Sequence, residues 1–241
     1  MCWSGEASTA LAVVGIATTA YAAYKKEPAV LWITLGYFSS MELLQAFTYT
    51  VIDDCSSPSN QIATLLGYLH IAFQPFFINA ISMYFIPDEI RRKISIPVYA
   101  FCFAVAIYMI LASYPFSWSG SCVGSLCSER LCSVSGSWHI AWELPLNLID
   151  YWNFGFFQIT GLSYVLAAFF LPILYGSWRF TLYHILMGPT IAYLLTESMH
   201  EQAAVWCLIS IALLLIVIKT PVRKIMHVGY WPLWFGYSNK R

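Results

Sequence analysis

The stretch QAAVWCLISIALLLIVI, residues 202–218, contains no charged side chain and ends at Lys219. A helix that crosses a membrane needs about 20 mostly apolar residues, with a range of about 17–25. The apolar residues here are continuous and do not alternate with polar ones, which favours a helix over a strand of a membrane barrel. This segment predicts an integral membrane protein.

The whole chain has a composition that fits this prediction. Of its 241 residues, 59% are hydrophobic and 10% are charged, whereas charged residues make up about a quarter of a typical soluble domain. A chain of this length cannot bury so much apolar surface in a water-soluble core. The net charge is zero, so the chain lacks the basic footprint of a nucleic-acid-binding protein. The partner that the composition predicts is the lipid bilayer.

Six further apolar stretches complete the predicted fold, an all-α bundle of seven transmembrane helices. No cation precedes the first stretch, and Lys25 and Lys26 follow it, the reverse of a cleavable signal peptide, so we expect it to be retained. The chain then divides into a transmembrane domain, residues 1–218, and an interfacial tail, residues 219–241. The predicted spans cover residues 8–24, 29–52, 61–86, 94–114, 154–175, 179–196 and 202–218.

The distribution of Lys and Arg predicts the orientation of the bundle. With seven spans, every cation except Arg130 falls on the side of the C-terminus. Cytoplasmic loops of membrane proteins carry an excess of these residues, so we expect the N-terminus outside and the C-terminus in the cytoplasm. The pattern fits a bacterial cytoplasmic membrane and a eukaryotic membrane equally well. The cations on the predicted inner side are Lys25, Lys26, Arg91, Arg92, Lys93, Arg179, Lys219, Arg223, Lys224, Lys240 and Arg241.

The longest connection, residues 115–153, lies on the predicted outer side. Its first part is rich in Ser, Gly and Cys, and its second part, residues 138–152, mixes aromatic, apolar and polar residues. This mixture is typical of a helix that lies in the membrane interface. We therefore predict an interfacial helix over residues 138–152, broken near Pro145.

Six cysteines lie on the predicted outer side or near it, and they are candidates for disulfide bonds because that compartment is oxidising. Six cysteines allow 15 pairings, and the sequence does not choose among them. A metal site of Cys122, Cys127 and Cys132 is an alternative, although their spacing differs from the usual Cys-x2–4-Cys zinc pattern. Free thiols are the third alternative. The candidates are Cys2, Cys55, Cys122, Cys127, Cys132 and Cys207.

Among the ionisable residues inside the predicted spans, where charges are costly and commonly mark function, Glu42 and His70 stand out. Glu42 lies nine residues before Val51, near the outer end of its span, and His70 lies nine residues after Gln61, where its span begins. Both therefore sit about 13 Å below the outer face. Their spans are consecutive and antiparallel, and we therefore predict that the two side chains pair. We interpret His184 and His227 as interface residues.

Further polar side chains extend this candidate site. Gln45 and Gln74 lie three and four residues from the two ionisable residues, which places each on the same helix face as its neighbour. Tyr193 and Glu197 line the outer part of the sixth span. We predict that these four residues bind substrate, a small molecule or a lipid. The alternative is that the amides fix the bundle through hydrogen bonds between helices.

The interfacial segment supplies a second constellation. His139 and Glu143 are four residues apart, and such a pair on a helix can supply two metal ligands. In the first functional hypothesis, a membrane-embedded hydrolase or lipid-modifying enzyme, His70, His139 and Glu143 hold a divalent metal such as zinc. A metal-bound water is then the nucleophile, and Glu42 or Glu143 is the catalytic general base.

The seven-span architecture with an intramembrane histidine and carboxylate resembles that of the alkaline-ceramidase and adiponectin-receptor hydrolases, which hold zinc between helices. The resemblance concerns architecture alone, because those proteins carry a His-x3-His pair in a late helix, where this chain has Glu197-x2-His200-Glu201. The second hypothesis is a transporter or receptor for a cation or a small molecule, which uses the same pocket. The third is a structural or assembly role. The oligomeric state stays open.

Overall fold

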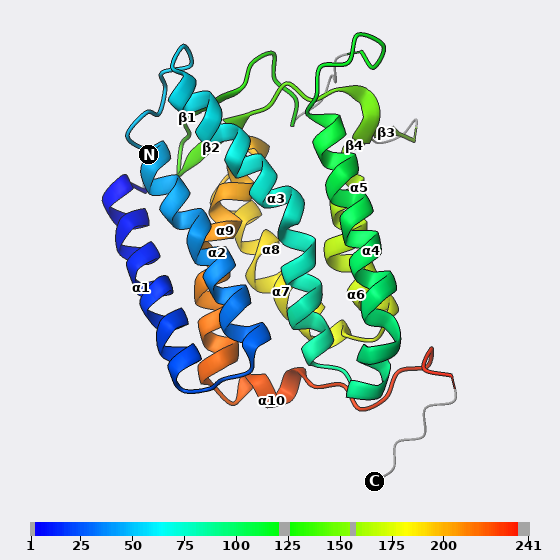
Figure 1. Ribbon diagram of the computed structural model, residues 1–241. Coiled ribbons are helices and arrows are strands. Elements are labelled where there is room, and N and C mark those ends of the chain that lie inside the picture. The colour runs from blue at the N-terminus through cyan, green and yellow to red at the C-terminus, as the bar shows by residue number, and fades with distance from the viewer. Residues whose placement is uncertain (1–2, 121–125, 155–157, 236–241) are drawn as a thin grey trace.

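The computed structural model describes residues 3–120, 126–154 and 158–235, and helices dominate it (Figure 1). In the described chain, four helices are long and apolar enough to cross a membrane, as expected for a membrane protein. A fifth helix, α2, is as long as α1 and packs against α1, α3 and α9. The four candidate spans are α1 (Gly5–Tyr24), α3 (Pro58–Tyr84), α4 (Asp88–Ala112) and α9 (Met199–Lys219), and the fifth long helix is α2 (Ala29–Thr48).

The region of the fifth predicted span contains a shorter helix than expected. The helix begins at Leu162 and continues through α5 (Leu162–Val165), a π-helical turn (Leu166–Phe170) and α6 (Leu171–Leu174). Residues before it form a small antiparallel pair, β3 (Tyr151–Asn153) with β4 (Gln158–Thr160). Gly161 separates the two structures with a φ of +79°, a value that favours glycine.

The region of the sixth predicted span is a broken helix. It consists of α7 (Trp178–Met187) and α8 (Pro189–Leu195), and Gly188 separates them with φ −108° and ψ −97°. Pro189 has no amide hydrogen to continue the ladder of α7. After α9, a short helix, α10 (Val222–Met226), turns the chain across the end of the bundle (Figure 1).

The prediction of an interfacial helix over residues 138–152 is wrong. The segment instead contributes β2 (Ile140–Glu143), which pairs antiparallel with β1 (Cys132–Ser135), and a 3-10 turn, η1 (Leu148–Asp150). A hairpin is favoured here because residues 136–139, which begin with Gly-Ser, make a short turn between the two strands. The hairpin is also tied to α3, since the Asn60 amide donates to Ser133 O and accepts from Ser133 N.

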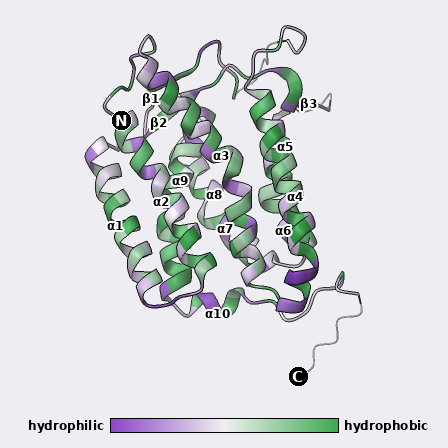
Figure 2. Cartoon of the chain, in the orientation of Figure 1, coloured by the Kyte–Doolittle hydropathy of each residue, from purple (hydrophilic) through white to green (hydrophobic). Residues whose placement is uncertain are grey.

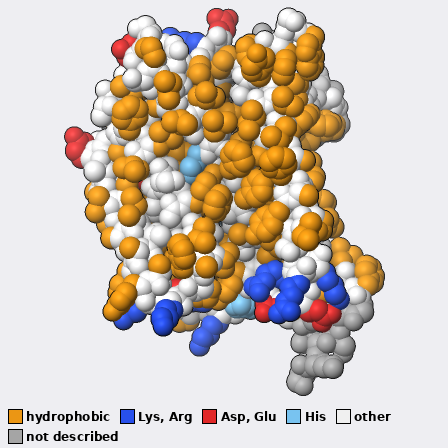
Figure 3. Space-filling view, in the orientation of Figure 1, with side chains coloured by type: hydrophobic (Ala, Val, Ile, Leu, Met, Phe, Trp, Pro, Cys, Tyr) orange, Lys and Arg blue, Asp and Glu red, His pale blue; other side chains and the backbone are white. Residues whose placement is uncertain are grey.

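The middle of the bundle is apolar both inside and outside. Leu31, Leu35 and Phe38 of α2 are buried in the main core with Ile211 of α9. Hydrophobic residues predominate along the long helices (Figure 2), and many of their large apolar side chains are exposed. Helices that are apolar on all sides are typical of membrane proteins. Figure 3 shows hydrophobic side chains spread over the face in view, with the charged side chains near its edges.

The two ends of the bundle differ in charge. We call the end that carries β1 and β2 the hairpin end and the end that carries α10 the tail end. Lys and Arg side chains gather at the tail end (Figure 3). Arg223 there forms an ion pair with Glu27 at 2.8 Å and donates to the Tyr84 hydroxyl. This ion pair joins the chain after α9 to the connection between α1 and α2.

Candidate functional site

A carboxyl and an amide on α2 lie in the interior of the bundle. Glu42 and Gln45 are three residues apart, hence on one helix face, and both side chains are fully buried. Within the described residues, neither oxygen of Glu42 and neither amide atom of Gln45 has a hydrogen-bond partner. Because buried polar groups in folded proteins are nearly all hydrogen-bonded, these four atoms mark a candidate binding site.

The surroundings of Glu42 are closely packed. Ser8 of α1 is fully buried and lies beside the carboxyl without a completed hydrogen bond. Cys207 of α9 lies near enough to interact with its charge. One turn away along α2, the Ser39 side chain packs directly against the backbone of α1, since a Cβ on Gly15 would come within 2.2 Å of Ser39 Oγ. A bulky ligand would have to separate these two helices.

Glu42 and His70 do not pair as predicted. The His70 ring stacks on Tyr37 at 4.0 Å between ring centroids, and its Nε2 lies 2.9 Å from Tyr37 O and 3.5 Å from Ser40 Oγ. Ser40 and Glu42 are two residues apart, which turns their side chains about 200° away from each other around the helix axis. His70 therefore contacts the opposite face of α2, although it lies at a similar depth.

His139 lies at the hairpin end, directly before β2, and is fully buried. Its Nδ1 is 2.7 Å from the hydroxyl of Tyr49, and its Nε2 has no partner in the part of the chain that is described. Burial lowers the pKa of this imidazole to about 3, so the ring is neutral near pH 7. Tyr49 is seven residues after Glu42, on the same face of α2, and joins His139 to that face.

Glu143 lies away from His139. It ends β2 and forms an ion pair with Arg130. Four residues of a strand span about 13 Å, so the two side chains cannot share a metal ion as they would on a helix. In the described residues, no group of three or more His, Cys, Asp or Glu side chains is arranged to hold a metal ion. The predicted set of His70, His139 and Glu143 is not assembled there.

The cysteines divide into two groups. Cys55 and Cys132 form a disulfide, which joins the connection between α2 and α3 to β1. Cys127 is also disulfide-bonded. Cys207 is a buried free thiol within α9, so its inclusion among the disulfide candidates is wrong. Cys2 and Cys122 lie outside the described residues.

Four residues were predicted to bind substrate, and the structure separates them. Tyr193 is 68% exposed and Glu197 is also exposed, so both point away from the bundle interior. Gln74 is buried, donates to Cys207 Sγ at 3.1 Å and accepts from the Tyr164 hydroxyl at 2.7 Å. Of the four, Gln45 alone shares a face with Glu42 and has open polar atoms in the described structure.

Glu201 has a structural partner that the sequence did not reveal. It is 1% exposed, and its carboxylate accepts hydrogen bonds from the backbone amides of Ser137 and Trp138. These bonds fasten the turn of the β1–β2 hairpin to the first turn of α9. The close fit extends to Gly136, where a Cβ would lie 2.0 Å from Glu201 Oε1.

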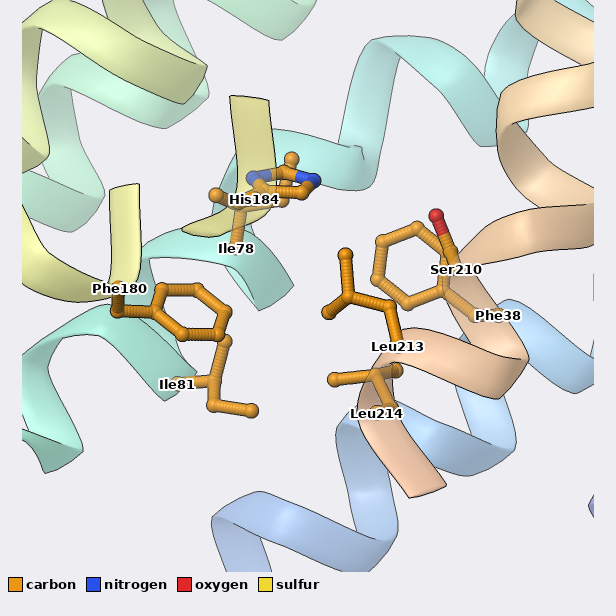
Figure 4. A pocket seen from close by; sticks show the side chains of 8 residues that line it. All are labelled: Phe38, Ile78, Ile81, Phe180, His184, Ser210, Leu213 and Leu214. Atoms are coloured by element: carbon orange, nitrogen blue, oxygen red, sulfur yellow. The ribbon is translucent and has the colours of Figure 1, made fainter. Parts of the chain in front are cut away.

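The break between α7 and α8 produces a second unusual environment, which the interpretation of His184 as an interface residue missed. His184 is 3% exposed, and its Nδ1 has no partner in the described structure. It lines a small cavity of about 10 Å³ with Ser210 and six apolar side chains (Figure 4), a space for about one water molecule. The adjacent Gly188 and Pro189 were the available signal, since this dipeptide interrupts helices.

Comparison with known proteins gives a family without an assigned activity. No curated protein and no solved structure matches the chain significantly. Residues 6–227 match DUF5765, a family of unknown function, and this match includes all but the first residue of the segment from α1 to α10 and both candidate environments. The chain therefore belongs to the DUF5765 family.

Proposed function

We propose that this chain is a membrane transport protein that binds a proton or a small metal cation at Glu42 and Gln45. The observation that carries the proposal is the burial of these two side chains, whose four polar atoms have no hydrogen-bond partner in the described structure. A carboxylate at this depth is costly when it is alone, and such residues in membrane proteins commonly mark ion or proton pathways. A bound proton or cation neutralises that charge.

The chemistry of the pair fits a hard cation or a proton. Two carboxylate oxygens and one amide oxygen are the oxygen ligands that such cations prefer. Close contact of α1 with α2 at Gly15 and Ser39 disfavours a larger ligand. The broken helix α7–α8 and the π-helical turn in Leu166–Phe170 also support transport, because discontinuous helices often line the binding sites of transporters.

The proposal includes a topology of seven membrane crossings, with the hairpin end outside. The four candidate spans are joined by α2, by the helix Leu162–Leu174 and by α7 with α8. Cations at the tail end support a cytoplasmic tail. A reporter fused after Arg241 should be cytoplasmic, and an epitope inserted after Glu129 should be accessible from outside. Both on one side would contradict this topology.

The hydrolase hypothesis stays a prediction. It requires three metal ligands, and no such group occurs among the described residues. Metal analysis of protein purified in mild detergent distinguishes the hydrolase hypothesis from the proposed ion site. Zinc bound in a one-to-one ratio would favour the hydrolase and count against the ion site, whereas the absence of zinc is the expected result.

The ion site is tested without knowledge of the transported substrate. A ligand that binds the folded state raises its stability, by about 2.7 kcal/mol at 100 times the dissociation constant. We expect the melting temperature of the wild type in detergent to rise with one of Li⁺, Na⁺, K⁺ or Ca²⁺, or to depend on pH through Glu42. Glu42→Gln should abolish that response, and Gln45→Ala should weaken it.

A matched control is Glu89→Gln, because Glu89 is exposed and forms an ion pair with Lys93 at the tail end. This variant should keep the wild-type response. The corresponding transport assay uses proteoliposomes with an internal pH dye and an imposed cation or proton gradient. A wild-type response that persists in Glu42→Gln, in both assays, would refute the proposal.

A further inference from the structure

A short chain of contacts leads from the surface at the hairpin end to Glu42. The indole Nε1 of Trp3 donates a hydrogen bond to Ser8 Oγ at 2.8 Å. Indole nitrogen is a donor only, so Ser8 accepts this bond and keeps its own hydroxyl proton to donate. The Ser8 hydroxyl lies beside the Glu42 carboxyl. Trp3 thus orients a donor toward the ion site.

Trp3 is itself held by the β1–β2 hairpin. Its backbone amide donates to Trp138 O at 3.0 Å, and the two indole rings stack with centroids 6.0 Å apart and planes inclined by 14°. Trp138 is fixed in turn, because its amide donates to Glu201 of α9. The start of the chain lies next to the hairpin in Figure 1. Three separate segments therefore meet at this pair of rings.

The same contacts cover the end of the α2 face that carries Glu42. Trp3 lies 6.0 Å from the buried His139 ring, and His139 stacks on Tyr49 at 5.8 Å. Gly5 permits this arrangement, since a Cβ there would lie 3.0 Å from Tyr49 Cβ. Access to Glu42 from the hairpin end is closed by aromatic rings, of which Trp3 and Trp138 are partly exposed.

We propose that Trp3 and Trp138 form a gate between the hairpin end and Glu42, and that Ser8 is the positioning residue that presents a hydroxyl to the bound ion or to Glu42. The inference rests on the proposed function of Glu42. The gate opens when the two rings separate, which also releases Ser8 from Trp3. The arrival of an ion is therefore linked to the orientation of Ser8 beside Glu42.

A water-soluble carbodiimide with glycine methyl ester tests the gate. These reagents convert an accessible carboxyl to an amide, and peptide mass spectrometry measures the modified fraction of Glu42. Added at the hairpin side of proteoliposomes, they should modify wild-type Glu42 slowly. Trp3→Ala should raise the rate about tenfold or more, because one hydrogen bond and one aromatic contact are lost together. Trp138→Ala should act in the same way.

Controls separate an opened gate from a damaged fold. Trp152→Ala removes a partly exposed indole of β3, bonded to Asp150, and should leave the rate unchanged. Each variant should keep the Cys55–Cys132 disulfide and a cooperative melting curve. Trp3→Phe keeps a stacking ring without the N–H, so it should stay closed but weaken the ion-dependent rise in melting temperature, as Ser8→Ala should.

The outcomes distinguish this inference from the ion site. If Trp3→Ala and Trp138→Ala react at the wild-type rate, the gate is wrong even where cations still stabilise the wild type. Dicyclohexylcarbodiimide reaches buried carboxyls through the lipid and needs no gate. If cations neither stabilise the protein nor protect Glu42 from this lipophilic reagent, and the melting temperature shows no pH dependence that Glu42→Gln removes, the ion site is wrong even where Trp3→Ala opens access.

Discussion

Replacing Glu42 by methionine should make the protein more stable while it removes the ion response. Methionine has nearly the same length and is unbranched, so the change replaces a carboxyl without opening a large cavity. A buried polar group without a partner costs about 1–3 kcal/mol, and the structure shows no partner for either oxygen among its described residues. The expected gain is therefore about 1–3 kcal/mol, or several degrees in melting temperature.

Gln74→Met is the matched comparison, because Gln74 is also a buried polar residue of the bundle but has partners at both ends. Its loss leaves the Tyr164 hydroxyl without its acceptor, and we expect destabilisation by about 1–3 kcal/mol. Both variants are measured by thermal unfolding in one detergent, with and without cations. If Glu42→Met is less stable than the wild type by more than about 1 kcal/mol, the carboxyl has a structural partner and the argument for an open site fails.

Three further predictions follow from the geometry. Cys55→Ser with Cys132→Ser releases a cross-link between residues 77 apart and should lower stability by about 2–4 kcal/mol; unchanged melting temperatures would exclude a stabilising role. Burial lowers the pKa of His139 to about 3, below its ordinary value of 6.5, so the unfolded state binds more protons between these values. Stability should fall as pH decreases through that window, by at most about 1.4 kcal/mol per pH unit; melting curves of His139→Gln should show a flatter dependence, and an equal slope would count against this account. The effects of Glu42→Gln and His70→Ala on the free energy of unfolding should be additive within about 0.5 kcal/mol in a double-mutant cycle, because His70 contacts the face of α2 opposite to Glu42. Coupling above about 1 kcal/mol would contradict the observed geometry.

The long helices were predictable because hydrophobic length is their signal. Predicted spans at residues 29–52 and 61–86 correspond to α2 and α3 with boundary differences of a few residues. The prediction of a span over residues 154–175 was wrong in part, because residues 158–160 form a strand. Apolar composition alone does not distinguish a short strand from a helix. The location of one disulfide, Cys55–Cys132, also followed from compartment and clustering, although its pairing did not.

The sequence pointed to Glu42 as a candidate site residue, but it did not predict which side chains surround Glu42. Glu42 was identified by the cost of a carboxylate in a span, and its burial fits that reasoning. His70 was assigned to it by depth alone. Depth follows from counting residues, whereas the face that a helix turns toward a neighbour follows from packing, and a rotation of about half a turn sends two side chains at one depth to different partners.

Buried amides show why partners decide between a structural role and a binding role. Asn79 of α3 donates to Pro75 O at 2.8 Å and to Ala167 O at 2.9 Å, and its oxygen accepts from the Tyr175 hydroxyl. Two of these partners lie 88 and 96 positions away in the sequence, so no local sequence pattern predicts them. Gln45 has the same chemistry in a span but no such partner in the described structure. An amide that joins helices is saturated by the fold, whereas an amide without a partner beside a buried carboxyl keeps its hydrogen-bonding groups for a ligand, and this difference supports the proposed site on α2.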